Sequence, residues 1–371
     1  MSGIPCVLVG HTKLFGGSGG GVQHCTREHV ALLEAGGFAI RKLEFEFDNS
    51  PFDRIARRFS SPRDNPPTGL LGRLDQALRL TQARHVFFAL DAFEHLSRSL
   101  RRAFPHVTQI LLSHGVEAVD VLVEQRLGET VKGGRPGAAL ARKLGRELVV
   151  SAARRKWLAG VVVLSPFEIE IEKWLGTKAS LWAPAIILEK PLSMKPMEGR
   201  IGCVTTLDHP PNAAGLIQLL EALQAPEFSG EFRLVGQPGE RGASIAAQFP
   251  FVRYLGSLSD DDLRQEASTW CSFINPIFVC AKGRSTKVGQ ALGWSLPIAT
   301  TEFGVRGYIW DQTLLPTPAT PASLAQLVIE QSRLSNFDRH RRMTQAIAAI
   351  SPRVDTVGQQ VRTFVRAVSE N

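Results

Sequence analysis

Short apolar runs recur along the first half of the chain, separated by stretches with helical spacing. Residues 4–10 form an apolar run of strand length, and residues 39–47 alternate apolar and charged side chains, which is typical of a strand with one wet face. Between them, residues 22–35 carry apolar side chains at helical spacing. Further strands are predicted at residues 85–89 and 108–113, and at the end of 157–165. Strands that alternate with helices predict a parallel sheet covered on both faces.

A proline-containing stretch at residues 188–199 interrupts this alternation, and a second series then begins. Strands are predicted at 200–206, 232–236, 253–255, 271–276 and 296–300, and helices at 212–223, 260–267 and 285–294. The sequence therefore predicts an α/β fold with two Rossmann-like halves, residues 1–190 and 191–351. Ligands of open α/β sheets bind at the carboxyl ends of the strands, so we expect both halves to present loops to a central cleft.

The amino-acid composition excludes several classes of protein. The chain has 371 residues, of which 44% are hydrophobic and 21% charged, which is ordinary globular material. Its five cysteines form no CxxC pair, which argues against a disulfide framework and a structural zinc site. The sequence shows neither a signal peptide nor an apolar run of spanning length. We expect a cytoplasmic protein.

The net charge of +8 is concentrated partly in residues 132–156. Six cations there alternate with leucines: Arg142, Lys143, Arg146, Arg154, Arg155 and Lys156. The pattern predicts an amphipathic basic helix with a solvated face. An anionic membrane surface or a lipid-phosphate substrate is the alternative, which would place the protein at the inner face of the membrane. Nucleic acid is not expected, because no nucleic-acid-binding motif is present.

A glycine-rich stretch, GGSGGGVQHCTREH, runs from Gly16 to His29 between the first strand and the first helix. It is not a dinucleotide fingerprint, because Val22 stands where the third small residue belongs, and no GK[ST] follows to make a P-loop. A plain linker and NAD binding remain alternatives. We favour a loop that lets a bulky polar ligand meet backbone N–H groups. His24, Cys25 and His29 have no third ligand nearby in the sequence, so no metal is expected.

Motifs in both halves, taken together, resemble the retaining glycosyltransferases of the GT-B fold, family four. The resemblance covers almost the whole chain. The matching features are the Gly20-Gly21-Val22-Gln23 loop, LLSHGVEAVD with His114 and Glu117, VVVLSPFEIE, the turn Asp208 to Asn212, FRLVGQPG, and PIFVCAKGRSTKVGQALGWSLPIATTEFGVRGY. The resemblance implies that a helix at about residues 352–371 packs back on the first domain, and a helix that simply caps the second domain is the alternative. It also implies a nucleotide-diphosphate sugar donor and no metal or other cofactor.

Two positions depart from the family pattern. The paired glutamates of the family fall on Lys282 and Gln290. An amide oxygen at position 290 can still accept a hydrogen bond from a ribose hydroxyl, whereas an ammonium at position 282 cannot replace a carboxylate.

Breaking the sugar–phosphate bond builds negative charge on the leaving diphosphate, so the site needs preorganised positive charge. Lys282, Arg284 and Lys287 lie within six residues directly before a predicted helix, and Ser285 and Thr286 are good N-cap residues. Three solvated surface cations are the alternative. The resemblance adds Thr205, Gly236 and Gln290 to the donor side, and we expect Lys287 and Arg284 to act on the leaving group.

His114 ends a predicted strand and is expected to contact the transferred sugar, with a buried structural histidine as the alternative. The loop with Gly20, Gly21 and Gln23, together with Glu117, is assigned to the sugar and acceptor side. No carboxylate pair suggests a hydrolytic acid/base couple, and no nucleophile elbow is present. Asp260, Asp261 and Asp262 are interpreted as helix-capping residues.

The sequence therefore predicts a retaining glycosyltransferase that moves a hexose-type sugar from a nucleotide-diphosphate sugar to a glycan or lipid-linked acceptor. The first rival is a catalytically silent GT-B protein that binds a carbohydrate or a partner. The second rival is an NAD-dependent oxidoreductase. The sugar, the nucleotide base, the acceptor and the linkage leave no mark in the sequence.

Overall fold

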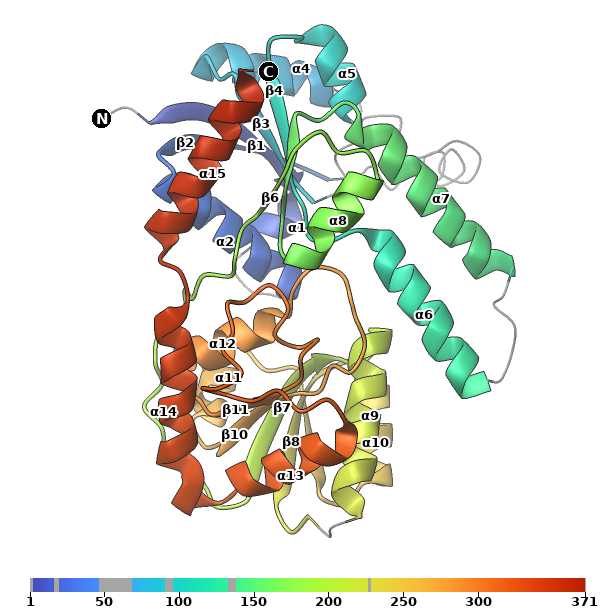
Figure 1. The fold of residues 1–371 in the computed structure, drawn as a ribbon, viewed down its shortest axis with the longest axis vertical. Coiled ribbons are helices and arrows are strands. Elements are labelled where there is room, and N and C mark those ends of the chain that lie inside the picture. Colours follow the sequence, from blue (N-terminus) through green and yellow to red (C-terminus); the bar gives the residue numbers. More distant parts are fainter. Residues whose placement is uncertain are drawn as a thin grey trace. The chain divides into compact units, whose positions relative to one another are not determined.

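A computed structural model describes residues 3–16, 20–46, 69–90, 96–132, 138–225 and 228–370 (Figure 1). The chain divides into two compact units. The first unit comprises Met1–Ala118, Arg142–Pro184 and Pro352–Asn371, and the second comprises Val119–Ala141 and Ala185–Ser351. Residues 119–141 thus pack with the second unit, although they precede the main junction in the sequence.

The first unit is built on a six-stranded parallel sheet with the order β2-β1-β3-β4-β5-β6. Its strands are β1 (Ile4–His11), β2 (Phe38–Phe45), β3 (His85–Ala89), β4 (Thr108–Leu112), β5 (Gly160–Val163) and β6 (Ser180–Trp182). The central strands are buried along their length because helices cover both faces of a parallel sheet. Strand β6 was not predicted, since its three half-buried residues leave no apolar run.

Helices of the first unit include α2 and the C-terminal α15, which lie side by side (Figure 1). The full set is α1 (Thr12–Phe15), α2 (Gly21–Ala35), α4 (Leu70–Thr81), α5 (Ser97–Ala103), α7 (Ala138–Arg155), α8 (Pro166–Trp174) and α15 (Val354–Ser369). Helix α15 returns to this unit, where Gln359 donates to the carbonyl of Ala35. A Cβ atom on Gly358 would lie 2.7 Å from the backbone nitrogen of Gly36, so the two helices meet backbone to backbone.

The second unit contains a five-stranded parallel sheet with the order β11-β10-β7-β8-β9. Its strands are β7 (Arg200–Thr206), β8 (Glu231–Gln237), β9 (Val252–Gly256), β10 (Ser272–Asn275) and β11 (Ile298–Thr300). The chain builds outward from β7 through β8 to β9 and then returns to the other side of β7 with β10. The crevice between β7 and β10 is therefore the topological switch point of this sheet.

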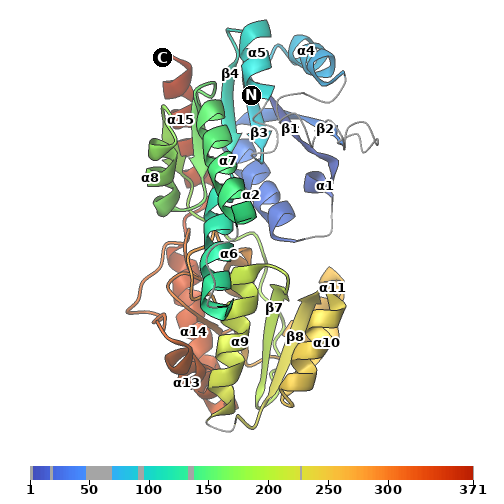
Figure 2. The same ribbon diagram turned by 90° about the vertical axis from the view of Figure 1, so that its right-hand side faces the viewer.

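Helices cover both faces of the second sheet, and Figure 2 shows α9 and α10 beside β7 and β8. They are α9 (Pro210–Gln224), α10 (Gly239–Gln248), α11 (Asp260–Ala267), α12 (Thr286–Trp294), α13 (Pro321–Gln331) and α14 (Leu334–Ile350). Helix α6 (Glu117–Lys132) belongs to this unit from Val119 onward. Successive residues of β10 face opposite cores: Phe273 packs with Trp294 of α12, and Ile274 lies in the core that contains Leu216 of α9. This alternation fixes α12 on one face of the sheet and α9 on the other.

The basic segment differs from its prediction at its C-terminal end. Arg154 and Arg155 are buried rather than solvated. Arg155 makes a two-point ion pair with Glu172 of α8, with Nε 2.7 Å from Oε2 and Nη2 2.9 Å from Oε1. A charge that loses its water must find a paired partner, and the rigid guanidinium fork finds one here. The predicted six-cation surface therefore retains Arg142, Lys143, Arg146 and Lys156, all exposed.

Candidate functional site

The switch point of the second sheet brings together the ends of two strands and the start of a helix. Strand β7 ends with Thr205 and Thr206, β10 ends with Asn275, and α12 begins at Thr286 after the loop that follows β10. This is where an open parallel sheet offers a crevice for a ligand. The three predicted cations of the segment 282–287 all lie in or beside this loop.

Lys287 reaches across the switch point from the first turn of α12. Its Nζ donates to Oγ1 of Thr205 at 3.2 Å. The pKa of this ammonium is lowered to about 8, chiefly by burial, while Cys203 acts to raise it and the positive charge of Arg306 acts to lower it. An anion beside Lys287 would offset the cost of desolvating its charge. The position is thus suited to a phosphate group.

Helix α12 adds a second source of positive potential at the same place. No side chain caps its amino terminus, and its first turn contains no acidic residue. Backbone N–H groups and the helix dipole at such an end attract anions. Ser285 occupies the N-cap position as predicted, but the expected side-chain cap is absent. Its Oγ donates instead to Oδ1 of Asn275, at 3.2 Å.

The backbone of the loop before α12 is held in place by two residues that follow β11. Arg306 donates from Nε to the carbonyl of Gly283, at 3.1 Å, and from Nη2 to that of Lys282, at 3.2 Å. The hydroxyl of Tyr308 donates to the carbonyl of Ser285 and accepts from the N–H of Gly289, both at 2.9 Å. These bonds preorganise the start of α12, which an electrostatic site requires.

The other two predicted cations have different surroundings from Lys287. Arg284 is buried. Lys282 is partly exposed, and its Nζ lies 3.6 Å from Oδ2 of Asp120 on α6. The same carboxylate accepts the backbone N–H of Lys282 at 3.0 Å and lies 3.3 Å from Nε2 of His209. The positive charge of Lys282 is thus shared with an acid, unlike a solvated surface cation.

The remaining donor-side candidates lie on β8 and α12. Gly236 has a φ of 153°, and a Cβ atom there would lie 1.8 Å from the carbonyl oxygen of Thr205. Its lack of a side chain is therefore required by the close approach of β7 and β8. Thr286 and Gln290 are half-buried on α12, and Gln290 lies one turn after Lys287.

The candidates of the first unit surround the end of β4 and the start of α2. His114 is buried two residues beyond β4, and its ring meets that of His29 edge to face, with centroids 5.2 Å apart. Burial lowers the pKa of His29 to about 4, so that imidazole is neutral at physiological pH. Glu117 is half-buried at the start of α6.

Helix α2 begins at Gly21 with Gly20 as its N-cap residue, and Gln23 is half-buried in its first turn. Residues 17–19 of the glycine stretch lie outside the described residues. His24 is engaged within the helix, 3.2 Å from Oε1 of Glu28 and 3.1 Å from Nη2 of Arg27. Among the residues that the structure describes, no group of three His, Cys, Asp or Glu side chains is arranged to hold a metal ion.

The acidic triplet at residues 260–262 caps a helix, as predicted. Ser259 is the N-cap residue of α11, and its Oγ accepts the N–H of Asp262 at 3.2 Å. Its hydroxyl also donates to the carboxylate of Asp262, at 2.6 Å.

Sequence reasoning missed five residues of the site: Asp120, His209, Asn275, Arg306 and Tyr308. Arg306 and Tyr308 lie inside the quoted motif that begins at Pro276, and His209 lies inside the quoted turn. Asn275 directly precedes Pro276, and a polar residue at a strand end is a usable signal. Asp120 ends the quoted motif LLSHGVEAVD, but nothing local indicates its pairing with Lys282, which lies 162 positions later in the sequence.

No family model matches the chain, and no curated protein matches its sequence. Solved structures match its fold over nearly its full length. The chain is similar to a sucrose-phosphate synthase from Thermosynechococcus elongatus, with a TM-score of 0.65, 15% identity and 98% of each chain covered. HepE of Anabaena, solved with UDP and glucose, gives a TM-score of 0.64 and 14% identity, over 98% of this chain and 100% of that one.

A glycosyltransferase from Rickettsia africae gives a TM-score of 0.63 at 10% identity, with both chains fully covered. Together with the two parallel sheets, these likenesses show that the chain has the GT-B fold. The predicted α/β architecture is confirmed.

Proposed function

We propose that the protein is a glycosyltransferase that moves a sugar from a nucleotide-diphosphate sugar to a glycan or lipid-linked acceptor, with retention of configuration. The observation that carries the proposal is the position of Lys287. It places a partly buried ammonium 3.2 Å from Thr205 at the switch point, beside the uncapped start of α12. Similar structures include one solved with UDP and glucose, which supports a nucleotide sugar as the ligand.

In this proposal the second unit binds the donor. Lys287 and the N–H groups of α12 stabilise the charge that grows on the leaving diphosphate, and Arg284 supports them. Thr205 and Ser285 offer hydroxyl groups to the phosphates, as does Thr286, and Gln290 offers an amide to the ribose. Lys282 shapes the approach to this point, because its charge is paired with Asp120. No metal or other cofactor takes part in the proposed reaction.

The first unit is assigned to the sugar and the acceptor. Gly20 and Gly21 give a loop on which backbone can approach a hydroxyl-rich ligand, and Gln23 and Glu117 offer polar groups there. His114 is proposed to contact the transferred sugar. The burial that keeps His29 neutral also favours hydrogen bonding over ion pairing around the neighbouring His114.

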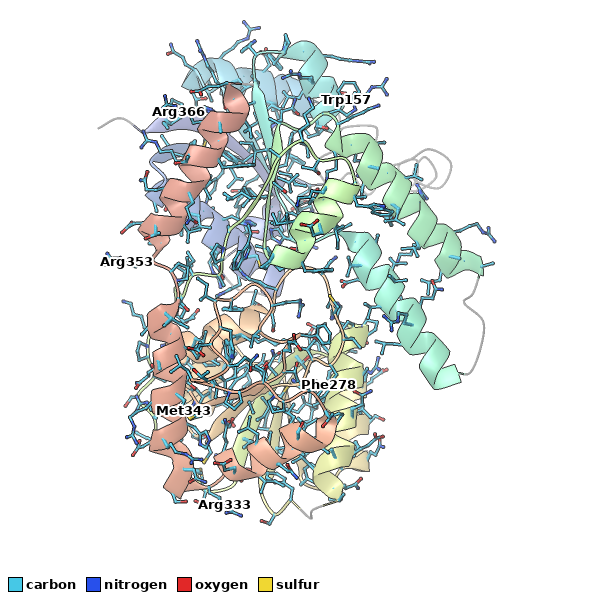
Figure 3. The ribbon with its side chains drawn as sticks, viewed as in Figure 1. Trp157, Phe278, Arg333, Met343, Arg353 and Arg366 are labelled. Atoms are coloured by element: carbon cyan, nitrogen blue, oxygen red, sulfur yellow. The ribbon has the colours of Figure 1, made fainter. Side chains whose placement is uncertain are left out.

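A basic surface on the first unit supports binding of the protein to an anionic membrane. We define it as the exposed side chains of Arg98, Arg101 and Arg102 on α5 and of Arg142, Arg146 and Lys156 on or beside α7. Trp157 connects the two helices (Figure 3): Lys156 lies 5.1 Å and Arg98 5.9 Å from its ring centroid. Each such cation contributes about 1 kcal/mol at an anionic bilayer. No described helix is long and apolar enough to cross a membrane.

Nucleotide binding is the first test. Purified protein is screened by thermal shift against UDP, GDP, ADP, CMP and NAD, because a ligand that binds the folded state raises the melting temperature. We expect one nucleoside diphosphate to raise it and NAD to have no effect. A shift with NAD alone would favour the oxidoreductase. Donor hydrolysis or transfer to an acceptor separates an enzyme from a silent GT-B protein.

Membrane binding is tested by flotation with vesicles that contain phosphatidylglycerol. The double substitution Arg142→Glu with Arg146→Glu is expected to reduce binding at low salt. The matched control reverses two exposed cations of the second unit, Arg241 and Arg253. Equal binding by wild type and Arg142→Glu/Arg146→Glu would remove the proposed surface.

A further inference from the structure

Lys282 stands where the resembled family has a carboxylate, and the structure shows a carboxylate beside it. Oδ1 of Asp120 accepts the backbone N–H of Lys282 at 3.0 Å, and Oδ2 lies 3.6 Å from its Nζ. The carboxylate of Asp120 on α6 thus contacts both the backbone and the side chain of Lys282, the residue at the position of the family's carboxylate.

The same loop is held from its opposite edge by Arg306. That guanidinium binds the carbonyl groups of Lys282 and Gly283, while Asp120 binds the N–H of Lys282. Both backbone polar groups of Lys282 are therefore engaged by charged side chains. Gly283 between these bonds has a φ of 62°, a conformation that favours glycine.

Asp120 is largely shielded from water, with 15% of its side chain exposed. Burial acts to raise the pKa of its carboxyl group, but the hydrogen bonds from His209 and from the Lys282 N–H, together with the charge of Lys282, outweigh burial and hold the pKa below its ordinary value. A charged hydrogen bond in such surroundings is stronger than one at an open surface.

We propose that Asp120 is a positioning residue that fixes the loop 281–285 and so aims the start of α12 and Lys287 at the donor diphosphate. It supplies from another part of the chain the carboxylate that the loop lacks in its own sequence. By pairing with Lys282 it also offsets the charge of that ammonium. The proposal rests on the proposed donor site, and it deepens that site by naming what holds it in shape.

Hydrogen exchange tests the positioning without any substrate. Asp120→Ala is expected to accelerate exchange of the N–H groups in residues 281–286, and Asp120→Asn, which keeps an acceptor oxygen, is expected to do so less. The control is Glu221→Gln, which removes an exposed acid from α9. Exchange in Asp120→Ala equal to that in Glu221→Gln overturns the proposal, whether or not the protein transfers sugar.

Donor kinetics test the functional consequence. A lost charged hydrogen bond of 1.5–3 kcal/mol corresponds to roughly 10-fold to 100-fold in affinity. Because Asp120 is proposed to aim Lys287, we expect Asp120→Ala to raise the donor KM by about tenfold and also to lower kcat, by less than Lys287→Ala does, since Lys287 itself remains. A fall in kcat alone, at unchanged KM and unchanged exchange, contradicts a positioning role.

A charge exchange separates pairing from simple packing. Lys282→Asp places a second carboxylate against Asp120 and is expected to raise the donor KM further. Adding Asp120→Lys restores opposite charges, and we expect the double variant to recover part of the lost affinity. A double variant no better than Lys282→Asp alone overturns the pairing as the cause. Melting temperatures of all variants show that the fold is retained.

Discussion

Helices α2 and α12 both begin at the carboxyl edge of a parallel sheet after a glycine-containing loop, yet their amino termini differ in charge. The first turn of α12 contains Lys287, and its preceding loop contains Lys282 and Arg284. The first turn of α2 contains no acid, and its first three residues, Gly21 to Gln23, are uncharged. Neither helix has a side-chain cap.

This difference separates two kinds of ligand chemistry on one repeated scaffold. A helix amino terminus that carries a cation and follows a hydrogen-bonded loop favours an anionic ligand, such as a leaving group whose negative charge increases during the reaction. A helix amino terminus with glycine and a neutral amide side chain favours ligands with hydroxyl groups. Such groups can hydrogen-bond to accessible backbone atoms and need no charged partner. We infer that the second unit takes the diphosphate and the first unit takes neutral sugar.

The largest predicted effect falls on Lys287. Lys287→Ala is expected to lower turnover by about a hundredfold, or roughly 3 kcal/mol, and to weaken nucleotide binding less, because the charge matters most in the transition state. Lys287→Arg is expected to recover only part of the rate, since its planar fork differs from a compact ammonium. Steady-state kinetics of both variants measure the loss of turnover and the change in donor binding. Gln23→Ala at the start of α2 is the matched comparison, and a greater loss of donor binding there than at Lys287 would reverse our assignment.

The next prediction concerns the other end of α2. Gly358→Ala would place a methyl group 2.7 Å from the backbone nitrogen of Gly36, and neither backbone can yield easily. We expect a loss of stability of about 1–3 kcal/mol, measured by chemical denaturation. Nucleotide binding by the folded variant should be unchanged. Unaltered stability would show that α15 does not pack tightly on α2.

The pH dependence of stability distinguishes a charged Lys287 from a neutral one. Its pKa falls from 10.5 in the unfolded chain to about 8 in the folded protein, so its desolvation destabilises the fold fully below pH 8. This cost disappears as pH rises from about 8 to 10.5. Lys287→Met should therefore melt at a higher temperature than wild type at pH 7, with a gap that narrows by pH 9.5. A gap that is constant with pH would mean that the ammonium is not desolvated.

The smallest predicted effect is at Gln290. Gln290→Glu provides a stronger acceptor for a ribose hydroxyl and should keep or tighten nucleotide binding, by less than about 1 kcal/mol. If the side chain packs against protein instead, the new carboxylate is buried without a partner and the melting temperature falls. Calorimetric titration with the preferred nucleotide, together with a melting curve, separates the two outcomes.

Sequence patterns determined most of the regular structure. Strand β3 at His85–Ala89 and helix α11 at Asp260–Ala267 match their predicted bounds, because apolar runs and acid-rich helix starts are local signals. Lys287 was also predicted from a local signal, the cations that cluster before an amphipathic helix, and its role stays a prediction. The short β6 escaped notice because half-buried residues in a three-residue strand carry no periodicity.

Tertiary structure alone decided the partners of the charged residues. Arg155 and Lys156 are neighbours in a basic run, yet one is fully buried against Glu172 and the other is exposed. Lys282 meets Asp120 from a distant helix, and Arg306 closes the loop from beyond β11. Hydrophobic periodicity is written in neighbouring residues, whereas the stabilisation of a charge depends on whatever the folded chain brings within a few ångströms of it.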